Sequence, residues 1–276
     1  MSMLNRVIPS SGEVIPVIGI GSWIKFDVGN NALEKEDLKK ILGLMHQHAA
    51  TLIDSSPMYG RSEQVIGDLT NETGLSENFF YATKVWTSGR EAGIRQMTDS
   101  MHKLRRSTID LMQIHNLVDW AVHLKTLRQW KEEGRIRYIG ITHYTTSSHV
   151  QLAELIKKEP IDFVQFNYSI ATRNAEKQLL PLALDKGIAV LINEPLEKGR
   201  LFEQVKNKSL PSWAKEYAIE TWAGFFLKYI LSHSAVTCVI PATSNPKHQQ
   251  DNLMAGEGDL PGENGRKKMA DLFDNL

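Results

Sequence analysis

The chain has 276 residues, 42% of them hydrophobic, and its 32 basic and 32 acidic residues cancel at neutral pH. A chain of this length can bury a sizeable core without disulfides. Its single cysteine, Cys238, excludes an intrachain disulfide and is expected to be a buried packing residue. The balanced charge argues against nucleic acid or an anionic membrane as a partner. No apolar run reaches the roughly 18 residues of a membrane-spanning helix, so we expect no membrane segment.

The N-terminal segment predicts a β-hairpin at about residues 6–16. The apolar runs RVIPS and EVIPVIG flank a Ser-Gly turn, an arrangement typical of two short paired strands. The first residues have no apolar centre of the kind found in signal peptides. We therefore expect a cytoplasmic protein, and the alternative is a protein whose export signal has been trimmed.

Short apolar runs then alternate with longer amphipathic segments. The runs are β-branched or aromatic and mostly apolar on both faces, which is typical of parallel strands covered by helices. Strands are expected at 17–20, 51–54, 79–85, 109–115, 136–142, 162–167, 188–193 and 236–241. Helices are expected at 34–49, 62–70, 90–105, 119–133, 147–158, 174–186, 213–231 and 246–254, with an extra helix at about 262–275.

Eight strands alternating with eight helices predict a (β/α)8 TIM barrel. Such barrels have roughly 250 residues, so we expect a single domain over residues 1–276. The alternative is a doubly wound sheet, which needs a glycine-rich phosphate turn after its first strand. The GIGS stretch at 19–22 lacks the third glycine and a later acidic partner, so it supports that alternative only weakly.

Ionisable residues stand at the ends of the predicted strands, where TIM barrels carry their chemistry. Lys84 interrupts the otherwise apolar strand FFYATKVW, and Asp54 ends the preceding strand. A buried lysine needs a carboxylate partner, so we expect these two side chains to pair. Taken alone, the pair is better explained as a structural ion pair that closes the barrel mouth.

Tyr59 and His115 favour a catalytic explanation of the pair. A phenol has a pKa near 10 and is a poor acid at neutral pH, but a lysine ammonium a few ångströms away lowers that pKa. A histidine within hydrogen-bonding distance would help to orient the incoming oxygen. With Asp54 and Lys84, these side chains predict a proton donor aimed at a small polar acceptor.

Eight segments, in order over about residues 14–253, resemble the aldo-keto reductase superfamily, in particular its short-tailed bacterial members. They are GIGSW, IDSSPMYGRSEQVIG, ATKVW, DLMQIHN, GRIRYIGITHY, FVQFNYS, LLPLALDKGIAVLINEPLEKGRLF and VIPATSNPKHQQDN. The resemblance implies a (β/α)8 barrel that binds NADPH and reduces the carbonyl of a small aldehyde or ketone. It also implies that Tyr59 is the general acid and that Lys84, paired with Asp54, lowers its pKa. His115 would orient the carbonyl.

The resemblance further implies a set of cofactor contacts. Thr142, His143 and Gln165 are expected to hold the nicotinamide carboxamide, with His143 in place of the usual asparagine. Asn193 stands where relatives often place an aromatic residue that stacks on the nicotinamide. The other expected contacts are Gly21, Ser22, Trp23, Asp54, Pro195, Leu196, Lys198, Thr243, Ser244, Asn245, Lys247, His248, Asp251 and Asn252.

The segment SNPKH bears on whether the protein prefers NADPH or NADH. Many relatives have arginine where His248 stands, so NADPH is expected and NADH is the alternative. The segment is also explained as a capped helix start, with Asn245 as the cap and Pro246 in the first turn. The two explanations are compatible.

The substrate pocket is expected to be lined by Trp23, Tyr59, Trp86, His115, Asn116 and Trp120, although each tryptophan also suits barrel packing. Glu194 is either a substrate-binding group or a salt-bridged residue of the rim.

No metal site is expected. His46 and His48 diverge on a helix, and no histidine or cysteine cluster supports a metal. The alternative function is an NADPH-binding sensor of the same fold with little turnover. The sequence does not predict the oligomeric state.

Overall fold

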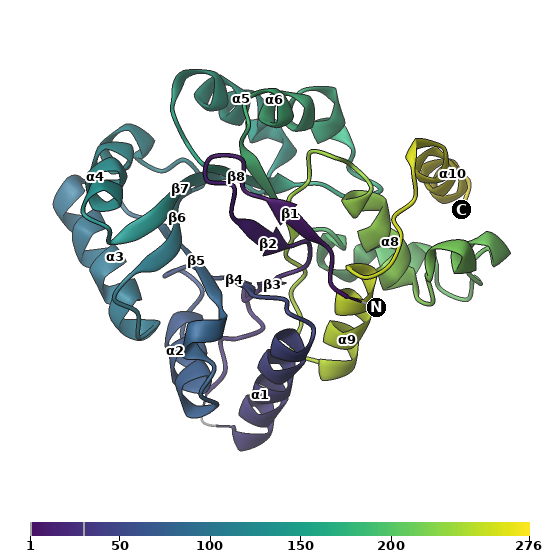
Figure 1. Ribbon diagram of the computed structural model, residues 1–276, viewed down its shortest axis with the longest axis horizontal. Coiled ribbons are helices and arrows are strands. Elements are labelled where there is room, and N and C mark those ends of the chain that lie inside the picture. Colours follow the sequence, from purple (N-terminus) through teal and green to yellow (C-terminus); the bar gives the residue numbers. More distant parts are fainter. Residues whose placement is uncertain (1, 30) are drawn as a thin grey trace.

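The computed structural model describes residues 2–29 and 31–276. Eight parallel strands follow one another around a barrel in chain order, each paired with its neighbour (Figure 1). They are β3 (Ile20–Gly21), β4 (Leu52–Asp54), β5 (Phe80–Val85), β6 (Ile109–His115), β7 (Ile136–Thr142), β8 (Phe163–Asn167), β9 (Ala189–Asn193) and β10 (Cys238–Val239).

The first and last strands meet and close the barrel. Ile18 forms a parallel bridge with Val239, and the Gly19 amide donates to the Val239 carbonyl at 2.9 Å. The predicted (β/α)8 fold is therefore confirmed. The strands predicted at 109–115 and 136–142 have the predicted bounds. Those predicted at 17–20 and 236–241 are shorter, because only a few ladder hydrogen bonds form at this closure.

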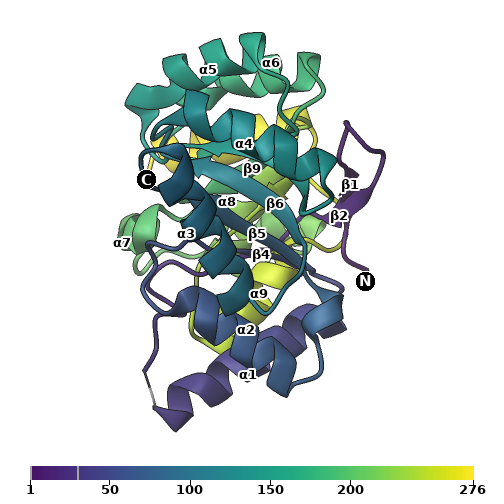
Figure 2. The ribbon, with the colours of Figure 1, turned by 90° about the vertical axis from the view of Figure 1, so that its left-hand side faces the viewer.

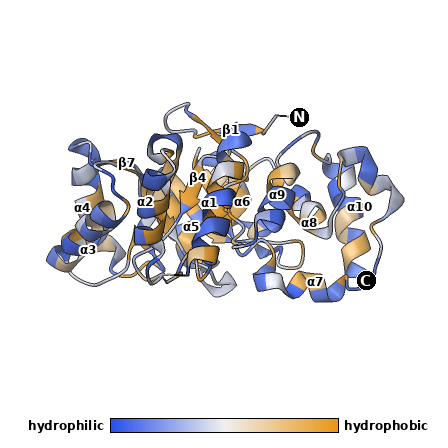
Figure 3. Cartoon of the chain, turned by 90° about the horizontal axis from the view of Figure 1, so that it is seen from below, coloured by the Kyte–Doolittle hydropathy of each residue, from blue (hydrophilic) through white to orange (hydrophobic). Residues whose placement is uncertain are grey.

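Helices surround the sheet (Figure 2). They are α1 (Ala32–Gln47), α2 (Ser62–Glu72), α3 (Arg90–Lys103), α4 (Trp120–Glu132), α5 (His149–Lys158), α6 (Leu179–Asp185), α7 (Arg200–Gln204), α8 (Trp222–Leu231), α9 (Pro246–Ala255) and α10 (Glu263–Asp274). Short 3-10 helices are η1 (Ser76–Asn78), η2 (Thr146–Ser148), η3 (Asn174–Lys177), η4 (Glu197–Gly199) and η5 (Ser212–Tyr217). Figure 3 shows hydrophobic strands at the centre and hydrophilic surfaces on many of the surrounding helices.

Two predicted helices are each divided in the structure. The segment 213–231 becomes η5 and α8, because Ala218 adopts a left-handed φ of 52° and Thr221 caps a new helix by accepting from the Gly224 amide at 3.0 Å. The segment 174–186 becomes η3 and α6. Pro181 lies in the first turn of α6, where its missing N–H is tolerated, whereas it would break a continuous helix from 174.

The N-terminal hairpin closes the end of the barrel opposite α7 (Figure 2). Its strands are β1 (Asn5–Val7) and β2 (Val14–Pro16), paired antiparallel with Arg6 opposite Ile15. Ile8 and Ile15 are buried and join the cluster of side chains inside the barrel. The hairpin therefore leaves the other end of the barrel as the open one.

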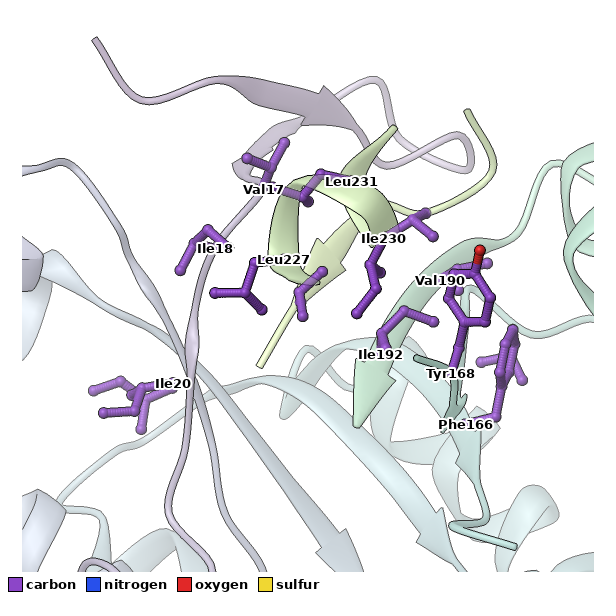
Figure 4. Close-up of a cluster of buried hydrophobic side chains, with 14 of the residues drawn as sticks. Val17, Ile18, Ile20, Phe166, Tyr168, Val190, Ile192, Leu227, Ile230 and Leu231 are labelled. Carbon is purple, nitrogen blue, oxygen red and sulfur yellow. The ribbon is translucent and has the colours of Figure 1, made fainter. Parts of the chain in front are cut away.

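The core has two layers because successive strand residues face opposite sides of the sheet. One layer fills the barrel with side chains such as Leu52, Phe80 and Leu111. The other lies between the strands and the helices; Figure 4 shows part of it, where Ile192 faces the α8 side chains. Cys238 is fully buried inside the barrel and burial raises the pKa of its thiol, which agrees with a packing role.

Candidate active site

The alternation that builds the apolar barrel interior also turns polar side chains inward near the open end. On β6, Leu111 belongs to the interior cluster, so Gln113 and His115 face the same way two and four residues later. On β5, the same spacing from Phe80 turns Lys84 inward. These inward polar side chains are buried, so each needs a partner inside the barrel.

Lys84 and Asp54 form the expected ion pair. Lys84 Nζ lies 2.6 Å from Asp54 Oδ2, and the two side chains are only 1% and 3% exposed. The ammonium also donates to the Ser55 carbonyl at 2.6 Å. Burial disfavours the charged lysine, but the negative charge of Asp54 and the nearby Tyr59 outweigh it, so the pKa of Lys84 is raised. The ammonium is therefore permanently charged at neutral pH.

The other oxygen of Asp54 is held by two glutamines. Gln113 Nε2 and Gln165 Nε2 each donate to Asp54 Oδ1 at 2.9 Å. Gly140 makes room for this arrangement, since a Cβ there would lie 2.8 Å from Gln113 Cγ. Gln113 was not among the site residues predicted from the sequence, although a glutamine inside the apolar strand IDLMQIH could have indicated it. Asp54 is thus fixed from two sides before any ligand binds.

Tyr59 lies beside this pair in the loop after β4. Its ring centroid is 5.1 Å from Lys84 Nζ, and its amide donates to the Ser56 carbonyl at 3.0 Å. Gly60 follows with a left-handed φ of 59°, and a Cβ there would lie 2.3 Å from the Asp27 carboxylate. Only glycine therefore fits after the tyrosine, which explains the Tyr-Gly element of the sequence.

The pKa of Tyr59 differs from the expectation that it is lowered. Burial raises it most strongly, and the positive charge of Lys84 and its hydrogen bond to the phenol act in the opposite direction. Asp54 and Glu194 raise it further, so the pKa of Tyr59 is raised overall. The direction of the Lys84 effect was predicted correctly, but the net shift was not, because sequence does not reveal how deeply the phenol is buried.

His115 faces Tyr59 as a neutral imidazole. The two rings are edge to face, with centroids 5.8 Å apart. Burial, followed by the positive charge of Lys84, lowers the pKa of His115 to about 2. Ser56 Oγ lies 2.9 Å from His115 Nδ1. Ser56 is a second residue that the sequence analysis missed, because nothing in the chain before folding links it to a histidine 59 residues away.

Of these side chains, Asp54, Tyr59, His115 and Gln165 line one part of a cavity of about 1090 Å³. Of the expected substrate-pocket residues, five line it: Trp23, Tyr59, Trp86, His115 and Asn116. Of the expected cofactor contacts, those lining it are Gly21, Ser22, Trp23, Asp54, Thr142, Gln165, Asn193, Pro195, Leu196, Lys198, Thr243, His248, Asp251 and Asn252. The cavity therefore joins the Tyr59 region to the start of α9.

Three of the expected residues lie outside this lining for clear reasons. Asn245 caps α9, accepting from the Lys247 amide at 2.9 Å, so the capped-helix explanation holds for that segment. His143 turns toward the Thr145 amide, 3.2 Å from its Nδ1. Trp120 starts α4 and packs against the hydrophobic core instead of reaching the cavity.

Ser244 and Lys247 complete the set that does not line the cavity. Conversely, Phe202 and the start of α8 line the cavity but were not among the predicted site residues, because only the folded chain brings them there. The missed residues of this end are Phe202, Thr221, Trp222 and Ala223.

Asn193 ends β9, at the position where proteins of the family that the sequence resembles often have an aromatic residue. Its Nδ2 donates to Gln165 Oε1 at 3.3 Å, and Thr142 Oγ1 donates to the same oxygen at 3.2 Å. The Asn193 Oδ1 atom is buried and has no partner within the described part of the chain.

Lys198 and Glu194 lie at the rim of the cavity. Lys198 Nζ lies 3.0 Å from Glu194 Oε1, 5.0 Å from the centroid of the Trp23 ring and 5.8 Å from that of Tyr144. Both residues have left-handed backbones, with φ of 57° and 50°. Glu194 is thus the salt-bridged rim residue, one of its two expected roles.

No group of three or more potential metal-binding side chains occurs in residues 2–29 and 31–276. Over the same ranges, no helix has the length and apolar character needed to cross a membrane.

Comparison with known proteins identifies the family. The profile of the Aldo/keto reductase family matches residues 17–265. The chain is 28% identical over 200 residues to the aldo-keto reductase YhdN of Bacillus subtilis, a match that spans 67% of this chain and 59% of that protein. It is 24% identical over 297 aligned positions to the NADH-specific methylglyoxal reductase of Escherichia coli, spanning 86% of this chain and 89% of that protein.

Solved structures give the same answer for the fold. An aldo-keto reductase from Klebsiella pneumoniae in complex with NADPH matches with a TM-score of 0.83 at 22% identity, over 99% of this chain and 96% of that one. The holo form of AKR11C1 from Bacillus halodurans matches with a TM-score of 0.79 at 22% identity, over 98% and 96%. With the family profile matching most of the chain, the protein belongs to the aldo/keto reductase family of oxidoreductases.

Proposed function

We propose that this protein reduces the carbonyl group of an aldehyde or ketone with NADPH, and that Tyr59 donates the proton to the carbonyl oxygen. The observation that carries the proposal is the buried Lys84–Asp54 pair, which holds an ammonium 5.1 Å from the Tyr59 ring at the cavity. The neutral His115 ring lies edge to face with the Tyr59 ring, with centroids 5.8 Å apart. A phenol, an ammonium and an imidazole around one point suit a proton transfer to oxygen.

Tyr59 keeps its proton until it is needed. Because the pKa of Tyr59 is raised by burial, the phenol is fully protonated at neutral pH. As negative charge develops on the carbonyl oxygen, the proton moves from Tyr59 Oη to that oxygen. Lys84 then stabilises the phenolate that remains, and its own raised pKa keeps it charged throughout.

His115 supplies a hydrogen bond to the same oxygen. Ser56 Oγ can accept from the Met58 amide, 3.4 Å away, and donate its own proton to His115 Nδ1, 2.9 Å away. The imidazole is neutral because its pKa is about 2, so its one proton then resides on Nε2. His115 therefore acts as an N–H donor that orients the carbonyl, without adding a positive charge.

The residues of the cavity fit a nicotinamide cofactor, which supplies the hydride when bound. At one end, the lining includes the polar side chains of Thr142, Gln165 and Asn193, which suit a carboxamide. At the other end, the lining includes Thr243, His248, Asp251 and Asn252, which suit an adenosine and its phosphate. A cavity of about 1090 Å³ has room for cofactor and a small substrate together.

His248 is the residue on which the expected preference for NADPH over NADH depends. His248 lines the cavity at this end, whereas Lys247 does not. We expect tighter binding of NADPH than of NADH, by a smaller margin than a permanently charged arginine would give. The relative from Escherichia coli is NADH-specific, so fluorescence titration with each cofactor is the direct comparison.

The test of the function is cofactor consumption. The purified protein is mixed with NADPH and, in turn, with aldehydes, dicarbonyls and quinones, and the loss of NADPH absorbance is followed. Turnover with at least one carbonyl compound supports the proposal. Binding of NADPH without turnover on any compound would contradict it and favour a sensor.

A further inference from the structure

Trp86 lines the cavity from a turn, residues 86–89, whose backbone lies beyond the sheet. Its indole ring lies beside His115, with ring centroids 6.4 Å apart, and the residue is 42% exposed. The strand β5 ends at Val85, which is also its last residue paired with β6. The position of the indole therefore depends on contacts that hold this Trp86 turn from outside the sheet.

One side chain of α3, Gln96, binds both backbone groups of Trp86. The Trp86 amide donates to Gln96 Oε1 at 2.6 Å, and Gln96 Nε2 donates to the Trp86 carbonyl at 3.1 Å. A glutamine amide can make both bonds because it carries an acceptor and two donors in one plane. Gln96 thus takes the place of a neighbouring strand and extends the fixed backbone by one residue past β5.

The rest of the Trp86 turn is held by α4 and the residue that precedes it. His123 Nε2 donates to the Thr87 carbonyl at 2.7 Å, and the His123 side chain is fully buried. The Gly89 amide donates to Asp119 Oδ2 at 2.7 Å, and Asp119 is the residue directly before α4. The turn is therefore tied to two helices along its length, and Gln96 holds the residue that carries the indole.

The two bonds of Gln96 affect the position of Trp86 more than the stability of the barrel. Gln96 is only partly buried, so its hydrogen bonds contribute modestly to the free energy of unfolding, because water can replace a lost partner. The exposed part of the indole has no protein atoms packed on it, so the ring depends on its backbone for a fixed place. Loss of Gln96 should therefore loosen the indole without unfolding the protein.

We propose that Gln96 is a positioning residue for substrate selection: it fixes the Trp86 backbone, so that the indole forms a rigid apolar wall beside His115. Gln96 does not line the cavity itself and acts only through Trp86. Aromatic aldehydes depend most on a fixed wall, because their rings pack on an indole in preferred geometries. Small aliphatic aldehydes make less contact with it. The inference rests on the proposed reductase function and adds a specificity determinant on α3.

The test is a double-mutant cycle that measures the ratio of kcat/KM for benzaldehyde to kcat/KM for propanal. Gln96→Met keeps the side-chain length and the helix propensity but removes both hydrogen bonds. Trp86→Ala removes the wall, and the double variant carries both changes. Gln64→Met is the matched control, because Gln64 is also partly buried and its amide donates to Asp68 Oδ1 within α2.

Trp86→Ala lowers the ratio by roughly 10-fold and Gln96→Met by roughly 3-fold, and the double variant has the same ratio as Trp86→Ala alone. Gln64→Met keeps the wild-type ratio, and NADPH affinity is unchanged in every variant. The inference is overturned, while the reductase function stands, if Gln96→Met leaves the ratio unchanged. It is also overturned if Gln96→Met lowers the ratio equally with and without the indole, because a general structural loss has that result.

Hydrogen exchange of the Trp86 amide provides a measurement that does not depend on turnover. Gln96→Met accelerates this exchange by roughly 10-fold, whereas Gln64→Met leaves it unchanged. Equal exchange in wild type and Gln96→Met overturns the inference. Turnover with other carbonyl compounds but with neither benzaldehyde nor propanal also overturns the inference alone. Absence of turnover with every carbonyl compound overturns the reductase function and the inference together.

Discussion

Two regions of the cavity wall are built in opposite ways. The cluster of Asp54, Lys84, Gln113 and Gln165 lies inside the barrel, with both Asp54 oxygens bonded and the ion pair almost inaccessible. The rim segment 194–200 lies outside the strands. Its Lys198–Glu194 pair is 52% and 28% exposed, and several of its residues have left-handed backbones.

The difference indicates a division of labour. Buried, fully bonded charges hold a fixed geometry, because moving one of them leaves its partner unpaired at low dielectric. Exposed pairs are screened by solvent and contribute little to stability, so the rim can rearrange around a ligand at small cost. In the proposed mechanism, proton transfer takes place beside the rigid cluster, and we expect cofactor access to depend on the rim.

The largest effect is expected from breaking the buried pair. Lys84→Met leaves the Asp54 carboxylate unpaired, which should lower the free energy of unfolding by about 3–5 kcal/mol. The measurement is denaturant unfolding of the variant and of Asp54→Asn/Lys84→Met. The double variant should recover part of the stability but no activity. A single variant as stable as the wild type would show that the pair is not tightly coupled.

Acid should destabilise the protein partly through His115. Its pKa is 6.5 in the ordinary state and about 2 in the fold, so below pH 6.5 the unfolded chain binds a proton that the folded protein does not. The resulting contribution to stability is present above pH 6.5 and is lost by about 1.4 kcal/mol per pH unit as the pH falls.

The measurement is the pH dependence of unfolding for the wild type and for His115→Asn. The variant lacks this titration, so its stability should decline less steeply below pH 6.5. The lowered pKa values of His143, His149 and His233 affect both proteins alike. Parallel curves would contradict the buried neutral state of His115.

A moderate effect is expected at Ser56. Ser56→Ala removes the hydroxyl that lies 2.9 Å from His115 Nδ1, so the Nε2–H tautomer is no longer favoured. We expect kcat to fall roughly 10-fold, with NADPH affinity unchanged. Ser55→Ala is the matched control, because the Ser55 hydroxyl bonds to Ser22 and not to His115. An equal loss in both variants would indicate packing damage.

The smallest effect is expected at the rim. Lys198→Ala removes an exposed ion pair and should change the free energy of unfolding by less than about 1 kcal/mol. NADPH affinity should still fall a few-fold, because Lys198 lines the cavity. Lys186→Ala, an exposed lysine beyond α6, provides the comparison. A large loss of stability at Lys198 would mean that the rim is as rigid as the cluster.

The sequence was sufficient for the barrel and for the meeting of Asp54, Lys84, Tyr59 and His115, because strand periodicity and strand ends fix these positions. The sequence did not predict which side chains form hydrogen bonds with one another. The hydrogen bonds of Gln113 to Asp54 and of Ser56 to His115 join different loops and strands, so neither follows from local pattern. The net pKa of Tyr59 depends on burial, which only the packed structure determines.

Contacts between distant parts of the chain also explain why the predicted and the observed cavity residues differ. Trp120 packs on the core although it lies near a strand end, and Phe202 reaches the cavity from a helix that the sequence did not predict. Such positions depend on loop geometry and not on periodicity.

The most direct measurement of the central claim is turnover by Tyr59→Phe, with NADPH binding measured on the same protein. Removal of the phenolic oxygen should lower kcat on the order of 10²–10⁴-fold and leave the NADPH dissociation constant close to that of the wild type. Reduction of an aldehyde by the variant at near the wild-type rate would contradict the role of Tyr59 as proton donor.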